Sequence, residues 1–192
     1  MKKTFPVLLL SLSVVCGLVR PAFANLVENG DFEKGPWDGN AWRGEGKVAI
    51  TSLQPAEGAA SLHVEGLTDD AQVQAISRKI AVEAGATYVL DCRYRVPSKG
   101  GAVHVRWDGS RGIVYQFKQT TETWRLLSEE IAAGTISVIS YPKALGDREG
   151  SEHLWNNRFT VPAAVIEVTL YVVQSGRGVV NVDDVRLVKA TR

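Results

Sequence analysis

Histidine and cysteine are scarce in this chain of 192 residues, which contains three histidines and two cysteines. His63, His104 and His153 show no metal-ligand spacing, such as a pair four residues apart on a helix. The sequence also lacks a Gly-x-Ser-x-Gly nucleophile elbow and a phosphate-binding loop. The sequence therefore offers no recognisable catalytic motif, although carboxylates that are distant in the sequence could still meet in the fold.

A charge excess of either sign is also missing. The chain has 22 Lys and Arg residues against 21 Asp and Glu residues, which gives a formal net charge of +1. Proteins that bind nucleic acid or anionic membranes usually carry a marked basic excess. We therefore expect neither as a partner.

Long apolar runs are confined to the N-terminus, where Val7–Val19 is a largely apolar run of 13 residues that follows Lys2 and Lys3. Ala22-Phe23-Ala24 then supplies small residues at the two positions that a signal peptidase reads. The pattern predicts a secretory signal peptide over residues 1–24 and one mature domain over residues 25–192, in the periplasm or outside the cell. A retained membrane anchor is the alternative, but a bilayer needs about 20 apolar residues.

Cleavage of the signal peptide would change the net charge and the cysteine count of the chain. Removing three basic residues leaves 19 basic against 21 acidic residues, a net charge of about −2. Cys92 would be the one remaining cysteine, so the mature chain could form no internal disulfide. A lone cysteine of this kind is typical of a small buried apolar side chain. No further stretch is apolar enough over sufficient length to span a membrane.

Alternation of apolar and polar residues dominates the rest of the chain. It is strict over residues 87–96, 103–108, 166–173 and 179–188, and shorter strand candidates are 47–52, 61–65, 73–82, 112–117, 124–131 and 135–141. Strict alternation indicates strands with one buried face. No window of a dozen residues shows a helical period, and Gly or Pro separates the segments. Many short strands at this spacing predict a sandwich or a barrel.

Several motifs follow one another in a particular order along the predicted mature chain. They are Asn25–Glu33 with Gly35, Trp37 and Trp42, then Gly58–Val64, Ala84–Tyr88, Thr123-Trp124, Phe159–Pro162 and Val182–Leu187. This order resembles carbohydrate-binding modules of families four, nine and twenty-two, the CenC type. The resemblance implies a galactose-binding-like fold, an all-β jelly-roll sandwich of two antiparallel sheets. One departure is that residues 131–157 separate the Trp124 segment from the Phe159 motif, which indicates an insertion.

The resemblance places a sugar site on the concave face of one sheet. Sugar sites combine aromatic rings that stack on pyranose faces with planar polar side chains that bind hydroxyls. Outward residues of the central strands are the candidates: Arg93, Arg95, His104, Arg106, Gln116, Thr169 and Tyr171. Trp42 and Trp155 are expected to border the cleft, whereas Trp107 and Trp124 are expected to be structural. The predicted ligand-binding set is Trp42, Arg93, Arg95, Arg106, Trp155 and Tyr171, and the alternative is a solvated, charged sheet face.

The resemblance also implies one structural calcium ion that joins the first strand to the last. Glu33 and Asp183 match the family's carboxylate positions, and the Asp31 carbonyl would add a further oxygen, whereas Glu57 matches only loosely. Ca²⁺ prefers several oxygen ligands of this mixed kind. The alternative is a capping residue and an outward carboxylate with no ion.

Three functions remain open at this point. The first is a secreted, non-catalytic module that binds a polysaccharide or glycoconjugate, with glycan-degrading enzymes acting in trans as further partners. The second is a structural or interaction domain of the envelope or of an extracellular complex. The third is a small jelly-roll lyase or hydrolase, which converging carboxylates or a Tyr–His–Arg cluster in a cleft would favour. Fold alone does not decide between them.

The signal sequence yields the first testable prediction. Exported protein should begin at Asn25, because Ala24 is the last small residue that the peptidase reads. Intact-mass measurement of the exported protein checks this. Retention of Met1, or a lipid on Cys16, would contradict the prediction.

Overall fold

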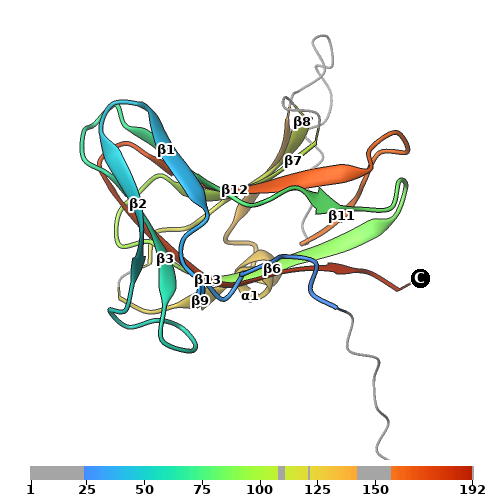
Figure 1. Ribbon diagram of the computed structural model, residues 1–192, viewed down its shortest axis with the longest axis horizontal. Helices are drawn as coiled ribbons and strands as arrows, with labels where there is room; N and C mark the ends of the chain where they lie inside the picture. The colour runs from blue at the N-terminus through green and yellow to red at the C-terminus, as the bar shows by residue number, and fades with distance from the viewer. Residues whose placement is uncertain (1–23, 108–110, 121, 142–156, 192) are drawn as a thin grey trace, which may run out of the picture.

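The computed structural model describes residues 24–107, 111–120, 122–141 and 157–191, and in them two antiparallel sheets face each other (Figure 1). The sandwich expected from the alternation is therefore confirmed. Sheet A contains, in spatial order, β1 (Asp38–Arg43), β4 (Gln72–Ile76), β12 (Glu167–Ser175), β7 (Gly101–Trp107), β8 (Arg111–Gln116) and β10 (Ser137–Tyr141), with β5 (Ile80–Ala81) paired to β12. Sheet B contains β11 (Arg158–Thr160), β6 (Thr87–Arg95), β13 (Gly178–Lys189), β3 (Ser61–Gly66) and β2 (Gly46–Thr51), with β9 (Arg125–Leu126) paired to β6.

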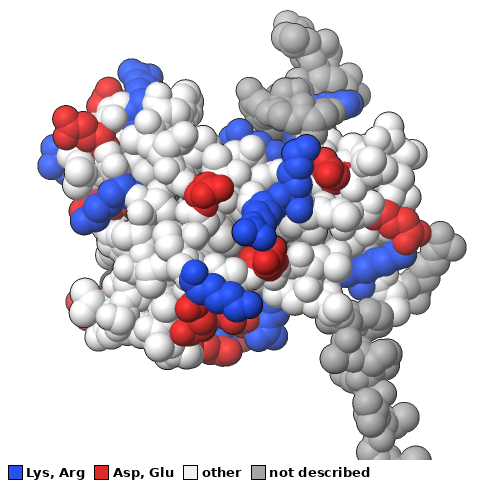
Figure 2. Space-filling model, in the orientation of Figure 1, with Lys and Arg blue, Asp and Glu red and all other residues white. Residues whose placement is uncertain are grey.

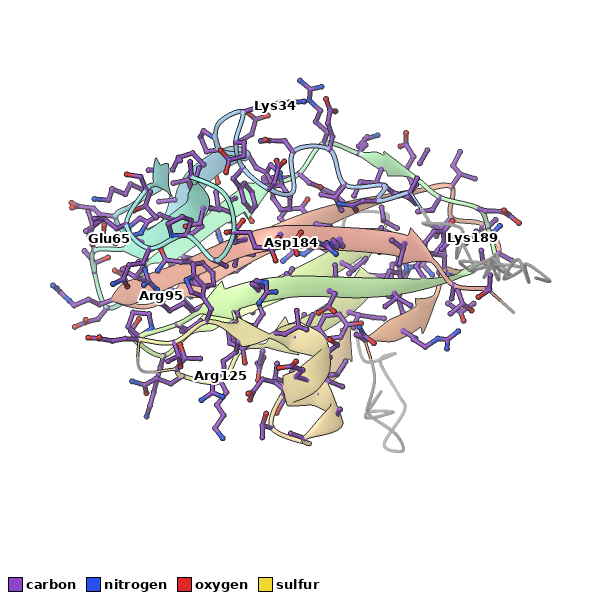
Figure 3. All side chains as sticks on the ribbon, turned by 90° about the horizontal axis from the view of Figure 1, so that it is seen from below. Lys34, Glu65, Arg95, Arg125, Asp184 and Lys189 are labelled. Atoms are coloured by element: carbon purple, nitrogen blue, oxygen red, sulfur yellow. The ribbon has the colours of Figure 1, made fainter. Side chains whose placement is uncertain are left out.

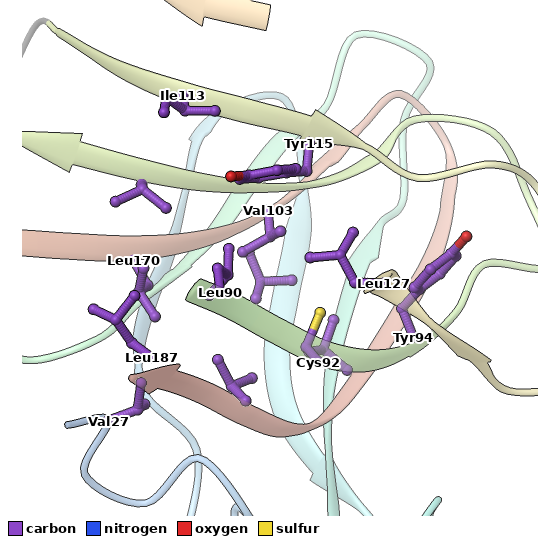
Figure 4. Packing of buried hydrophobic residues seen from close by; sticks show 14 of the residues in the cluster. Val27, Leu90, Cys92, Tyr94, Val103, Ile113, Tyr115, Leu127, Leu170 and Leu187 are labelled. Atoms are coloured by element: carbon purple, nitrogen blue, oxygen red, sulfur yellow. The ribbon is translucent and has the colours of Figure 1, made fainter. Parts of the chain in front are cut away.

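The core lies between the two sheets, and it is built from every second residue of each strand. Along β6, Leu90 and Cys92 are fully buried, whereas the residues between and beside them are half-buried. Figure 4 shows these two side chains packed among Val103 and Leu170, which come from the opposite sheet. Burial raises the pKa of the Cys92 thiol well above its ordinary value, so this cysteine stays protonated and apolar, as expected.

Four elements differ from the sequence prediction. The expected strand over 73–82 is divided into β4 and β5, and the expected strand over 124–131 becomes β9 followed by the six-residue helix α1 (Leu127–Ala132). Only Leu127 and Ile131 are buried in α1, one turn apart, which is too little to produce a helical period in the sequence. β1 and β11 were not expected, because β1 is mostly exposed and β11 has only three residues. Within the described ranges, no helix has the length and apolar character that a membrane crossing requires.

Sheet A is curved across its width. In Figure 1, β1 lies on one side of β12 and β8 on the other, and both rise above it. Twist and bulges bend large sheets in this manner. The outer face of sheet A is therefore concave, and side chains from its distant edges point toward a common space.

Two tryptophans of sheet A give a stability prediction with an internal control. Trp107 is 8% exposed and stacks on Phe159, with ring centroids 6.3 Å apart, whereas Trp42 is 64% exposed. Trp107→Ala should lower the free energy of unfolding by about 3–5 kcal/mol, since it leaves a cavity in the core. Trp42→Ala should change it by no more than about 0.5 kcal/mol. Urea unfolding measures both values, and equal losses would contradict the placement of Trp107 in the core.

Candidate functional site: the concave face of sheet A

Strand register fixes two rows of side chains across the outer face of sheet A. Residues that are directly opposite each other in an antiparallel pair project to the same face. One row is Asn40, Gln74, Val173, Ala102, Gln116 and Ser137. The next row is Asp38, Ile76, Tyr171, His104, Val114 and Ile139. The sheet therefore brings together residues from all six of its long strands.

Members of both rows line a hollow of about 510 Å³. Its polar and aromatic lining includes Trp42, Gln72, Gln74, His104, Arg106 and Gln116. Trp42 lies where the register between β1 and β4 shifts, and such a bulge re-aims the side chain it carries. The indole and the glutamine amides are the kinds of group that stack on sugar rings and bind their hydroxyls. Trp42 thus borders a cleft, as the sequence predicted.

Three residues of this face contact one another. The Arg106 guanidinium lies over the Tyr171 ring, with its carbon 4.5 Å from the ring centroid. Its Nη2 donates a hydrogen bond to Nδ1 of His104 over 3.0 Å. Burial, and next to it the charge of Arg106, lower the pKa of His104 to about 4. The imidazole is therefore neutral at pH 7, which allows it to accept the bond from an arginine that can only donate.

Arg93 and Arg95 do not lie on this face, which corrects the prediction that they share one concave face with Arg106. Both belong to β6 of sheet B and point away from sheet A, and Figure 3 shows the labelled Arg95 on that outer side. Arg93 pairs with Glu57 over 3.1 Å. Arg95 donates to the Gln54 side chain over 2.8 Å and lies over the Trp124 ring. Alternation shows which side of its own strand a residue occupies, but it does not show which sheet the strand joins.

The predicted insertion contributes to the site through its described part. It forms β10, which pairs with β8 at the edge of sheet A and places Ile139 in the lining of the hollow. Trp155, the other aromatic residue expected at the cleft, lies outside the described residues. Trp124 donates from Nε1 to the Gln54 carbonyl over 2.9 Å, in agreement with the structural role expected of it.

The carboxylates predicted to bind calcium converge on the loop between β2 and β3. Oε1 of Glu33 accepts hydrogen bonds from the amides of Ala59 and Ala60, over 2.7 and 3.2 Å. Oδ2 of Asp183 accepts from the amides of Ala56 and Glu57, over 2.9 and 3.0 Å. These hydrogen bonds join the loop to the Asn25–Glu33 motif and to the last strand, β13. We call this arrangement the loop clasp.

Glycine at position 58 allows the loop clasp to close. Its φ is +63°, and a Cβ atom there would lie 2.2 Å from Oε1 of Glu33. The Asp31 carboxylate accepts a hydrogen bond from the Glu33 amide over 3.5 Å, and the role expected of the Asp31 carbonyl stays a prediction. In the described part of the chain, no three Asp, Glu, His or Cys side chains gather closely enough to hold a metal ion. The clasp oxygens accept backbone amide hydrogens in this structure, and the calcium ion, whose expected ligands include a backbone carbonyl, stays a prediction.

The two facing antiparallel sheets define the class of protein, a jelly-roll β-sandwich module, and one of its sheets carries a hollow on its outer face. The chain belongs to the carbohydrate binding domain family, whose model matches residues 24–132, more than half of its length. The match ends where the predicted insertion begins. A search of curated proteins returns no significant match.

Solved structures share this fold at low sequence identity. The enzymatically active domain of tailspike protein 4 from bacteriophage CBA120 is 14% identical, with a TM-score of 0.59 over 86% of this chain. This chain spans only 21% of that phage protein. TmCBM61, in complex with β-1,4-galactotriose, is 16% identical, with a TM-score of 0.52 over 87% of this chain and 99% of that module. The CBM22 tandem domain of Xyn10C from Paenibacillus barcinonensis is 15% identical, with a TM-score of 0.50 over 90% of this chain and 48% of that one. These similarities establish the fold.

The loop clasp yields a stability prediction that also tests calcium. In chelator, Asp183→Asn should lower the free energy of unfolding by about 1.5–3 kcal/mol, because a buried charged acceptor of two backbone amides is lost. Asp31→Asn is the matched control and should change it by no more than about 0.5 kcal/mol. Thermal melts of the wild type in chelator and in excess calcium complete the experiment. A melting temperature that rises with calcium would support the predicted ion, and equal melting temperatures would contradict it.

Proposed function

We propose that the protein is an exported glycan-binding module without chemistry of its own, and that it holds a polysaccharide or glycoconjugate in the hollow of sheet A. One observation carries the proposal: the hollow of this carbohydrate binding domain gathers an exposed indole, glutamine amides and an arginine on one curved face. Export rests on the predicted signal peptide. Glycan-degrading enzymes acting in trans would benefit from a module that retains their substrate.

The chemistry of the face suits this role. Trp42 offers a broad apolar surface at one edge of the hollow, where a sugar ring can stack with a gain of roughly 0.5–1.5 kcal/mol beyond its buried area. Gln72, Gln74 and Gln116 provide donors and acceptors that can bind hydroxyl groups in either direction. The strands that carry them are held by backbone pairing on both sides, so these groups need little reordering when a ligand binds.

The cluster of Arg106, His104 and Tyr171 favours a second candidate, eliminative cleavage of a uronate polymer. In such a reaction a base removes the C5 proton, the C4–O bond breaks, a C4–C5 double bond forms and the departing oxygen takes a proton. Neutral His104 or Tyr171 would exchange the protons, and Arg106 would bind the sugar carboxylate. We rank this second because His104 already uses Nδ1 to hold Arg106, and because the family is defined by binding.

Substitutions on the two opposite faces test the placement of the site. Trp42→Ala and Tyr171→Ala should each weaken glycan binding about tenfold, since each removes an aromatic surface from the concave face. Arg95→Ala, on the outer face of sheet B, is the control and should bind as the wild type does. Affinity gels with β-1,4-galactan, xylan and polygalacturonate, followed by titration, give the measurement. The same incubations are read for the ultraviolet absorbance of an unsaturated uronate.

Each outcome of this experiment is informative. Loss of binding in Arg95→Ala alone would move the site to sheet B. If the wild type binds none of the glycans, the result would favour an interaction domain of the envelope or of an extracellular complex. Appearance of the unsaturated product, abolished by His104→Gln, would make the protein a lyase.

A further inference from the structure

The hollow of sheet A has an unbalanced charge. Among the described residues that line it there is no Asp or Glu, and the side chain that is charged at neutral pH is Arg106. His104 is neutral there, as its lowered pKa of about 4 indicates. The ligand site therefore presents one positive charge and several neutral amides.

Within the described part of the chain, the acids on the same sheet face are too distant or already paired. Asp38 lies in the row of His104 but on β1, three strands from β7, which corresponds to about 14 Å. Glu167 is at the far end of β12 and pairs with Lys79 over 2.9 Å. Neither carboxylate neutralises Arg106.

Three other arginines in the described ranges are each paired with a carboxylate. Arg93 pairs with Glu57 over 3.1 Å, Arg177 with Asp69 over 3.1 Å, and Arg186 with Asp184 over 2.7 Å. Arg106 instead contacts a neutral imidazole and an aromatic face, although it is half-buried. A guanidinium keeps its charge in such surroundings, and a partly buried charge without a counter-ion is unfavourable. An anionic ligand would remove that penalty.

We propose that the glycan bound by this protein is acidic, and that Arg106 binds its anionic group. The inference rests on the proposed glycan site and names its ligand class: a polymer with uronic acid carboxylates or sulfate esters. His104 and Tyr171 hold the guanidinium in place and leave other N–H groups free to form a paired contact with two oxygens. Acidic and basic side chains are interspersed over the side of the molecule seen in Figure 2, so that side carries no broad patch of one charge.

Matched polymers that differ only in charge test the inference. Polygalacturonate is compared with its methyl ester, and dextran sulfate with dextran, so that the carboxylate and sulfate sources are separated. The wild type should bind one acidic polymer at least tenfold more tightly than its neutral counterpart, and added salt should weaken this binding. Arg106→Gln should lose that preference. Arg95→Gln removes the same charge from the opposite face and should retain it. Melting temperatures confirm that both variants are folded.

The outcomes separate this inference from the function on which it rests. Binding of the neutral polymers or of galactan and xylan, with no gain from charge, would overturn the acidic ligand and leave glycan binding intact. Equal losses in Arg106→Gln and Arg95→Gln would reveal nonspecific attraction and also overturn it. Binding to none of the polymers, charged or neutral, would count against both proposals.

Discussion

Each sheet of the sandwich can bury only one face, and this constraint decides which side chains remain for function. Val103, Leu170 and Leu90 meet in the core because apolar burial drives the two sheets together. The intervening residues of sheet A must then face outward, and the curvature of the sheet turns that face into a hollow. Arg106, Tyr171 and His104 meet on that outer face as a consequence of strand parity and register, and Arg106 and His104 line the hollow. No loop has to bring them together.

Alternation in the sequence was enough to predict much of this arrangement. It identified the long strands β6, β7, β12 and β13, the buried state of Cys92 and Trp107, and the outward direction of Arg106 and Tyr171. These predictions succeed because a period of two depends only on local backbone geometry and on one buried face. The motif order then supplied the class of fold, which the family match confirms.

Other features depend on contacts that local pattern does not encode. Arg93 and Arg106 both occupy outward positions of alternating segments, so the sequence pattern does not distinguish them. Their strands join different sheets, because strand pairing depends on contacts between residues that are distant in the sequence. Trp42 lies on the exposed edge strand β1, whose alternation is too weak to detect. The loop clasp joins residues more than 100 positions apart, Asp183 with Ala56 and Glu57, through backbone amides that any residue type could supply.

Strand β10 shows how such a module can vary while its core is conserved. An edge strand needs only the unpaired backbone groups of its one neighbour, here β8, so adding it leaves the pairing of every inner strand unchanged. Yet Ile139 on this strand reaches the lining of the hollow. The breadth of the outer face of sheet A can therefore change without altering the pairing of the inner strands. Shortening or lengthening this one segment would change the extent of the hollow and leave the rest of the sandwich as it is.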